Sequence, residues 1–188
     1  DGRTDVDPHP GPIKRPFVLT TVGGGSDGGR IVEAAAGARM PEGQDHLVVA
    51  GPQLDDASME RARSLAGPTT TVVRTCSGLA HRIREATAVI SMGGYNTVCE
   101  ILAADTPALI VPREVPRLEQ TIRARALAGG HLIDTLSQAD ATPEALSRWL
   151  NGAVTTRTDR SRIARGGLAA AAHAAMTLIA PANDGDLQ

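Results

Sequence analysis

The sequence is poor in aromatic side chains, because its 188 residues include one Trp, one Tyr and one Phe. A core must therefore be built from alanine and aliphatic side chains, which supply most of the 41% of residues that are hydrophobic. Lysine is almost absent too, since Lys14 stands alone against eighteen arginines. The 19 basic residues are spread along the chain and balanced by 21 acidic ones, so a nucleic-acid partner is not expected.

Cysteine is equally scarce, and Cys76 and Cys99 lack the spacing and the histidine neighbours of a zinc site. A zinc site or a disulfide framework is therefore not expected, and no metal or other cofactor is predicted. No apolar run approaches the roughly 18 residues that a membrane-spanning helix needs, and residues 1–14 lack the apolar stretch of a secretory signal. A reducing cytoplasm is the expected location. Because residue 1 is Asp rather than Met, we interpret the chain as a part of something longer.

Short apolar segments alternate with segments of helical periodicity over most of the chain. Strands are predicted over 17–22, 46–50, 70–74, 87–91, 107–111 and 131–134, and helices over 56–66, 79–86, 96–104 and 118–128, with further helices after residues 29 and 142. This alternation predicts right-handed crossovers between parallel strands. The expected fold class is α/β, a Rossmann-like doubly wound parallel sheet of about six strands flanked by helices.

The sequence divides into three expected parts. Residues 1–16 are polar and contain four prolines, which predict an extended interdomain linker. Residues 17–151 carry the alternating strands and helices and are expected to form one folded domain. Residues 152–188 include an alanine-rich stretch, so we predict a helical C-terminal tail.

A glycine-rich loop over residues 23–29 lies between the first predicted strand and the first predicted helix. Glycines let the backbone approach a ligand, and a helix N-terminus offers unpaired N–H groups and a partial positive charge to a phosphate. The spacing differs from the Gly-x-Gly-x-x-Gly pattern, and no Lys-Ser or Lys-Thr pair of a P-loop follows. A flexible surface turn is the alternative interpretation.

A second loop and helix over residues 91–100 hold a candidate acidic group. At 100° per residue, Gly93, Asn96 and Glu100 fall on one stripe, whereas Tyr95, Val98 and Leu102 are predicted to point the opposite way, towards the buried side. An ionised carboxylate on the exposed stripe can accept two hydrogen bonds from a ribose diol. The alternative is a solvated glutamate that merely favours the helix dipole.

Together these segments resemble the C-terminal, donor-binding domain of GT-B glycosyltransferases of the MurG type, glycosyltransferase family 28. Residues 24–31, Gly-Gly-Ser-Asp-Gly-Gly-Arg-Ile, are similar to the family's Gly-Gly-Ser-Gln-Gly-Ala-Arg-Ile loop. Residues 94–100 and 107–112 resemble its Thr-Val-Ser-Glu helix and the following strand. A group of predicted bacterial glycosyltransferases with a Met-Gly-Gly-Tyr-Asn-Thr-Val-Cys-Glu segment is more similar still. The resemblance covers most of the chain and implies that residues 17–151 bind a nucleotide sugar.

Eleven residues are predicted to bind the donor: Arg3, Gly25, Ser26, Cys76, Leu79, Gly94, Asn96, Thr97, Glu100, Glu119 and Gln120. The resemblance implies that Glu100 binds the ribose hydroxyls and that Gly25 and Gly94 admit the phosphates. It implies that Ser26 and Thr97 lie beside the diphosphate and the sugar.

The remaining matches concern the two ends of the donor. Arg3 matches an interdomain arginine that contacts the diphosphate, although a mobile terminal arginine is the alternative. Cys76 and Leu79 match the loop that holds uracil, although Cys76 is equally well explained as a small buried hydrophobe. Glu119 and Gln120 stand where the family has Gln-Gln, which binds the sugar hydroxyls. Because a carboxylate accepts hydrogen bonds without donating them, the identity of the sugar is left open.

The resemblance implies the donor half of an inverting, metal-independent hexosyltransferase that uses a UDP-sugar and is inactive alone. An acceptor site and a catalytic base are expected on a missing amino-terminal domain or subunit. No Asp-x-Asp motif stands in a predicted donor loop, and none of the five histidines (His9, His46, His81, His131 and His173) stands in a motif with an acid or a nucleophile. The alternatives are a stand-alone donor-binding subunit of a split glycosyltransferase, a UDP-sugar epimerase half, or a simple nucleotide-binding module.

Overall fold

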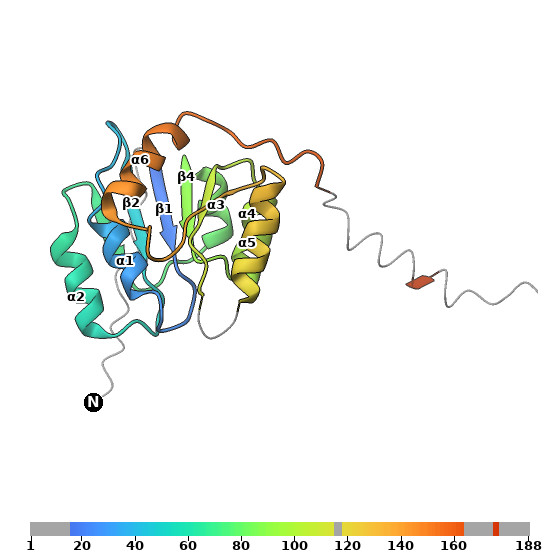
Figure 1. Ribbon diagram of the computed structural model, residues 1–188. Coiled ribbons are helices and arrows are strands. Elements are labelled where there is room, and N and C mark those ends of the chain that lie inside the picture. Colours follow the sequence, from blue (N-terminus) through green and yellow to red (C-terminus); the bar gives the residue numbers. More distant parts are fainter. Residues whose placement is uncertain (1–15, 115–117, 164–174, 177–188) are drawn as a thin grey trace, which may run out of the picture.

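The computed structural model describes residues 16–114, 118–163 and 175–176, which form a parallel sheet with helices on both faces (Figure 1). Its strands are β1 (Phe17–Thr21), β2 (Asp45–Val49), β3 (Thr70–Val73), β4 (Ala88–Ser91), β5 (Ala108–Ile110) and β6 (Asp134–Thr135). Its helices are α1 (Gly29–Ala36), α2 (Asp56–Leu65), α3 (Leu79–Glu85), α4 (Tyr95–Leu102), α5 (Glu119–Gly129) and α6 (Pro143–Ala153). The predicted Rossmann-like doubly wound fold is confirmed.

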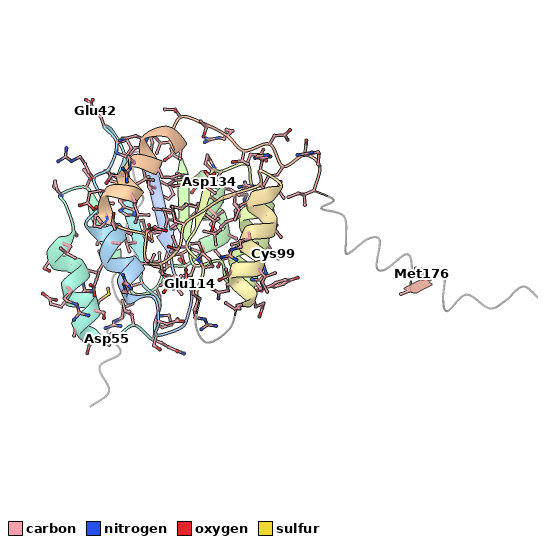
Figure 2. All side chains as sticks on the ribbon, viewed as in Figure 1. Glu42, Asp55, Cys99, Glu114, Asp134 and Met176 are labelled. Carbon is pink, nitrogen blue, oxygen red and sulfur yellow. The ribbon has the colours of Figure 1, made fainter. Side chains whose placement is uncertain are left out.

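The strand order is β3-β2-β1-β4-β5-β6, and every pair of neighbouring strands is parallel. All strands therefore end at one edge of the sheet, the lower edge in Figure 1. Figure 2 shows Asp55 and Glu114 near this carboxyl edge and Glu42 and Asp134 towards the opposite, amino edge. The strand order reverses between β1 and β4, because β2 and β3 follow on one side of β1 and β4, β5 and β6 follow on the other. Open sheets of this kind bind ligands at the carboxyl edge beside such a reversal.

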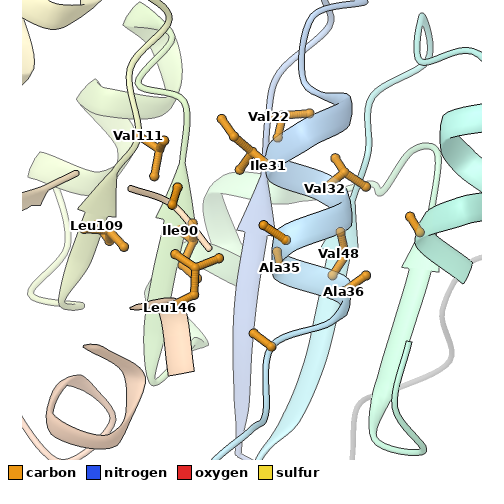
Figure 3. Packing of buried hydrophobic residues seen from close by; sticks show 14 of the residues in the cluster. Val22, Ile31, Val32, Ala35, Ala36, Val48, Ile90, Leu109, Val111 and Leu146 are labelled. Carbon is orange, nitrogen blue, oxygen red and sulfur yellow. The ribbon is translucent and has the colours of Figure 1, made fainter. Parts of the chain in front are cut away.

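Successive residues of the strands face two separate cores. Val18, Val48 and Ile90 are buried beneath α1, α2 and α6. Figure 3 shows Val48 and Ile90 of this cluster from close by. Their neighbours Leu19 and Val89 belong to the other core, against α3, α4 and α5. Burial on both faces explains why the strands are apolar without alternation. It also fixes the sheet as a rigid support for the loops at its edges.

The last strand lies later in the sequence than predicted. Residues 131–134 were expected to form it, but β6 is Asp134–Thr135. The cause is the turn that ends α5, in which His131 has a φ of 57° and its N–H donates to the carbonyl of Ala128. The N–H of Leu132 also donates back to the carbonyl of Leu127. The chain is therefore extended only from Asp134 onwards.

The segment that follows α6 packs on the sheet instead of continuing as a helix. Helix α6 ends at Ala153, and residues 154–163 contain turns but no helix, whereas residues 175–176 of the predicted tail are helical. The predicted linker, except for Pro16, and most of the predicted tail lie outside the described residues. None of the helices in the described part is long and apolar enough to cross a membrane.

Arg160 anchors this segment at the amino edge of the sheet by hydrogen bonds to backbone carbonyl groups. Its side chain is fully buried, and its Nη1 donates to the carbonyl oxygens of Ala104 (2.7 Å) and Thr106 (2.9 Å). Its Nε donates to the carbonyl oxygen of Leu132 at 2.9 Å. One guanidinium thus satisfies backbone groups from the segments that precede β5 and β6.

Candidate functional site

The structure brings the predicted site residues to one edge of the sheet. Gly25 and Ser26 lie in the loop between β1 and α1, and Cys76 and Leu79 lie between β3 and the start of α3. The residues after β4 are Gly94, Asn96, Thr97 and Glu100, and those at the start of α5 are Glu119 and Gln120. All these segments start from the carboxyl edge. The eleventh residue, Arg3, lies outside the described residues.

The turn that starts α4 is fixed by Gly93. This residue has a φ of 78°, and a Cβ atom there would lie 2.7 Å from Cγ2 of Ile110. A side chain at this position would be strained and would also collide with β5. The carbonyl oxygen of Gly93 accepts a hydrogen bond from Arg123 Nη1 at 3.0 Å. Helix α5 therefore holds the loop that leads into α4.

Helices α1 and α4 begin at glycines that provide no side-chain cap. Their N-cap residues are Gly28 and Gly94, whereas α2 is capped by Asp55 and α6 by Thr142, each accepting a backbone N–H. The first N–H groups of α1 and α4 are consequently left without a side-chain acceptor. A Cβ atom at Gly94 would meet nothing within 4 Å, so open space lies next to this turn. Such a helix start favours an anion such as phosphate.

Glu100 lies in the second turn of α4 and is partly exposed. Among the described residues, its carboxylate has no hydrogen-bond or ion-pair partner. Its oxygens can therefore accept hydrogen bonds from a ligand without first breaking an internal contact. Of the stripe expected from the sequence, Asn96 is exposed and Glu100 is partly exposed, whereas Gly93 is buried.

Tyr95 does not point towards the buried side as predicted. Its side chain is 68% exposed, and the guanidinium of Arg123 lies 5.5 Å from the centre of its ring. Tyr95 is the first residue of α4, and helical side chains lean towards the N-terminus, so this ring projects past the edge of the sheet. Val98, one turn later, is buried as predicted. Leu102, predicted on the same buried side, is only partly buried, and the buried residues of α4 are instead Thr97, Val98 and Ile101. The predicted buried side of this helix is therefore confirmed at Val98 and wrong at Tyr95.

Glu119 and Gln120 both have partners within the protein. The Glu119 carboxylate pairs with Arg123, one turn further along α5. The Oε1 atom of Gln120 accepts a hydrogen bond from the backbone N–H of Arg113 at 3.1 Å. Their predicted contacts with the sugar stay a prediction. The structure adds that Gln120 also holds the loop after β5 through Arg113, whereas Glu119 has its partner within α5.

The loop after β3 presents a small apolar surface. Cys76 and Leu79 are partly buried and pack against the core beneath α3, α4 and α5. The Cys76 thiol donates to the carbonyl oxygen of Ser77 at 3.3 Å. This environment is that of a small hydrophobe, and it equally provides the apolar contact that a nucleobase needs.

Two charged residues were missed by the sequence analysis. Arg113 Nη1 and Asp27 Oδ2 lie 2.9 Å apart, so an ion pair joins the glycine-rich loop to the loop after β5. These residues are 86 positions apart, and no local pattern links them. The one available signal was Asp27 itself, which stands where the family's loop has Gln.

The described histidines offer no obvious base at this edge. His46 is buried in β2, where its Nε2 lies 2.8 Å from Thr20 Oγ1. Burial lowers the pKa of His46 to about 3, so it is neutral near pH 7. His81 pairs with Glu85 within α3, and His131 lies at the amino edge. In the described part of the chain, no three His, Cys, Asp or Glu side chains are grouped to hold a metal ion.

A parallel sheet of this strand order, with two glycine loops without side-chain caps at its point of reversal, defines a doubly wound, Rossmann-like domain. Residues 19–176 match the family described as glycosyltransferase family 28 C-terminal domain. The chain belongs to this family.

Relatives and solved structures agree with this assignment. A Brucella canis protein named UDP-N-acetylglucosamine--N-acetylmuramyl-(pentapeptide) pyrophosphoryl-undecaprenol N-acetylglucosamine transferase is 30% identical over 140 residues, which cover 70% of this chain and 36% of the relative. The chain thus spans about a third of the length of the curated relatives it matches.

Among solved structures, MurG of Acinetobacter baumannii has a TM-score of 0.60 at 22% identity, over 86% of this chain and 46% of that one. The calicheamicin glycosyltransferase CalG4 has a TM-score of 0.65 at 19% identity, over 89% of this chain and 45% of that one. These similarities show that the fold is that of a GT-B glycosyltransferase domain.

Proposed function

We propose that the chain binds a UDP-hexose donor for an inverting glycosyl transfer that requires no metal ion. The observation that carries this proposal is the unpartnered Glu100 carboxylate on the helix that starts at the uncapped Gly94 turn. A ribose acceptor and a phosphate-binding helix start are thereby joined in one element, beside the reversal of the sheet.

Each remaining part of the donor has a proposed contact. The diphosphate lies against Gly25, Ser26 and Gly94, where the helix starts supply the positive potential that a divalent cation would otherwise provide. The uracil packs on Cys76 and Leu79. Asn96, Thr97, Glu119 and Gln120 face the sugar. In the complete protein, Arg3 reaches the diphosphate.

The acceptor site and the catalytic base belong, in this proposal, to an amino-terminal domain of a longer protein or to a separate subunit. An inverting transfer needs a base for the acceptor hydroxyl but no enzyme nucleophile, so the donor half has little proton chemistry to perform. The name of the Brucella canis relative suggests UDP-N-acetylglucosamine as the first donor to try. A different donor sugar is the alternative, because the Glu119 carboxylate cannot donate a hydrogen bond to a sugar hydroxyl.

The test is a calorimetric titration of the chain with UDP, ADP and GDP in the presence of EDTA. We expect UDP to bind more tightly than ADP or GDP, and the chain alone to transfer no sugar from UDP-N-acetylglucosamine. Preference for another nucleotide would overturn the choice of base, and a strict need for Mg²⁺ or Mn²⁺ would overturn the metal-independent mechanism. Epimerisation of UDP-N-acetylglucosamine by the chain would favour the epimerase instead.

A further inference from the structure

We infer that the Asp27 carboxylate holds the place of a donor phosphate and that Arg113 exchanges this carboxylate for the diphosphate when the donor binds. The inference rests on the proposed function. It assigns Arg113 as a donor-binding residue and Asp27 as an internal competitor of the donor, two roles that belong to the glycine-rich loop and the loop after β5.

The position of Asp27 is the first observation. A Cβ atom at Gly25 would lie 2.8 Å from Asp27 Oδ1, so this carboxylate bends back over the glycine at which a phosphate is expected. Its other oxygen, Oδ2, is 2.9 Å from Arg113 Nη1. An anion bound by a guanidinium already lies where the donor diphosphate is proposed to bind.

The chemistry of the two anions makes them interchangeable to an arginine. Carboxylate and phosphate both present paired oxygens to the guanidinium fork. Two anions cannot share the same space above Gly25, because a carboxylate that stayed there would repel the diphosphate. The similar family loop has Gln in place of Asp27 and carries no such charge. In this chain, donor binding therefore requires Asp27 to leave.

The fold permits this exchange without a large rearrangement. The side chains of Arg113 and Asp27 are 32% and 38% exposed, and an ion pair at such a surface contributes little to stability. The backbone of Arg113 is held by α5, since its N–H donates to Gln120 Oε1 and its carbonyl oxygen accepts from Thr121 Oγ1. Gln120 is therefore a positioning residue for Arg113, whose side chain can turn while its backbone stays fixed.

Arg113 also has unused donor capacity. Its Nε is buried and has no hydrogen-bond partner among the described residues. The ion pair with Asp27 thus satisfies the guanidinium only in part. A diphosphate offers more acceptor oxygens than one carboxylate and can engage Nε as well as the Nη groups.

The experiment compares UDP affinity by calorimetry in EDTA for the full chain, Arg113→Gln, Asp27→Asn and the double variant. We expect Arg113→Gln to weaken UDP binding about tenfold, because one charge-assisted contact with the diphosphate is lost. We expect Asp27→Asn to strengthen it about threefold or more, because the competing anion is removed while the shape is kept. In the Arg113→Gln background, Asp27→Asn should again strengthen binding.

The matched control is the ion pair between Arg61 Nε and Glu33 Oε1, which has the same length of 2.9 Å but joins α2 to α1. Arg61→Gln and Glu33→Gln should leave UDP affinity unchanged. A pair that only ties the two loops together would give weaker binding in both Arg113→Gln and Asp27→Asn, and this result would overturn the inference. The rise in affinity of Asp27→Asn is a result that partial unfolding cannot produce.

The two proposals fail in different ways. A wild-type chain that binds no UDP would overturn the proposed function and this inference together. A wild-type chain that binds UDP with the same affinity as Arg113→Gln would overturn the inference alone.

Discussion

Glu100 is the residue on which ribose recognition depends. We predict that Glu100→Ala weakens UDP binding by about 1.5–3 kcal/mol, the usual value for a hydrogen bond to a charged group. The fold should be unaffected, because the carboxylate has no partner among the described residues and the side chain is partly exposed. Calorimetry measures the loss, and Glu60→Ala on the exposed side of α2 is the control. Equal UDP affinity for wild type and Glu100→Ala would remove the ribose assignment.

Gly93 and Gly94 are neighbours, but the structure leaves room for a side chain only at Gly94. Gly93→Ala should lower the free energy of unfolding by about 2 kcal/mol or more, because it strains a positive φ and collides with Ile110. Gly94→Val should lower it by no more than about 1 kcal/mol, because the N-cap has open space and an extended backbone with φ −55° and ψ 145°.

The effect of Gly94→Val is expected on UDP binding rather than on stability. Folded Gly94→Val should lose UDP binding, because its side chain would fill the space that a phosphate must approach. Urea unfolding gives the stabilities, and calorimetry gives the affinities. Normal UDP binding by Gly94→Val would reduce this loop to a structural turn.

At the scale of the elements, the segment after α6 is an integral part of the fold. We predict that Arg160→Ala lowers the free energy of unfolding by about 3 kcal/mol, because two buried carbonyl groups and one partly buried carbonyl group lose their donor. Arg157→Ala is the matched control, since Arg157 is three residues away and exposed, and it should change stability by less than about 0.5 kcal/mol. Similar urea midpoints for these two variants would show that the segment is only loosely attached.

The order of the elements could be predicted because each one carries its own local signal. Continuous apolar runs mark buried strands, and the glycines of 23–29 and 93–94 mark the two loops at the reversal of the sheet. The start of β6 could not be predicted, because it depends on a non-glycine residue, His131, taking a positive φ at the end of α5.

Long-range contacts could not be predicted from the sequence for a different reason. The pairing of Asp27 with Arg113 and the burial of Arg160 depend on segments that only the folded sheet brings together. A single sequence contains their charges but no pattern that connects them. The exposure of Tyr95 likewise depends on where α4 begins relative to the edge of the sheet.

At the scale of the whole molecule, each edge of the sheet carries a candidate ligand site. A cavity of about 300 Å³ opens at the amino edge and is lined by Ala108, Ala128, His131, Ile133, Asp134, Thr135 and Thr158. The proposed donor site lies at the opposite, carboxyl edge, where α1 and α4 start at Gly28 and Gly94 and where Glu100 has no partner among the described residues. We therefore expect the nucleotide at the carboxyl edge and not in this cavity.

Hydrogen exchange of the backbone amides with and without UDP tests the location of the site most directly. We predict that UDP protects residues 23–29 and 92–100, at the starts of α1 and α4, and leaves residues 129–135 unchanged. Protection at these two loops would place the nucleotide at the reversal of the sheet. Protection of residues 129–135 by UDP, without any at residues 23–29 or 92–100, would contradict the account.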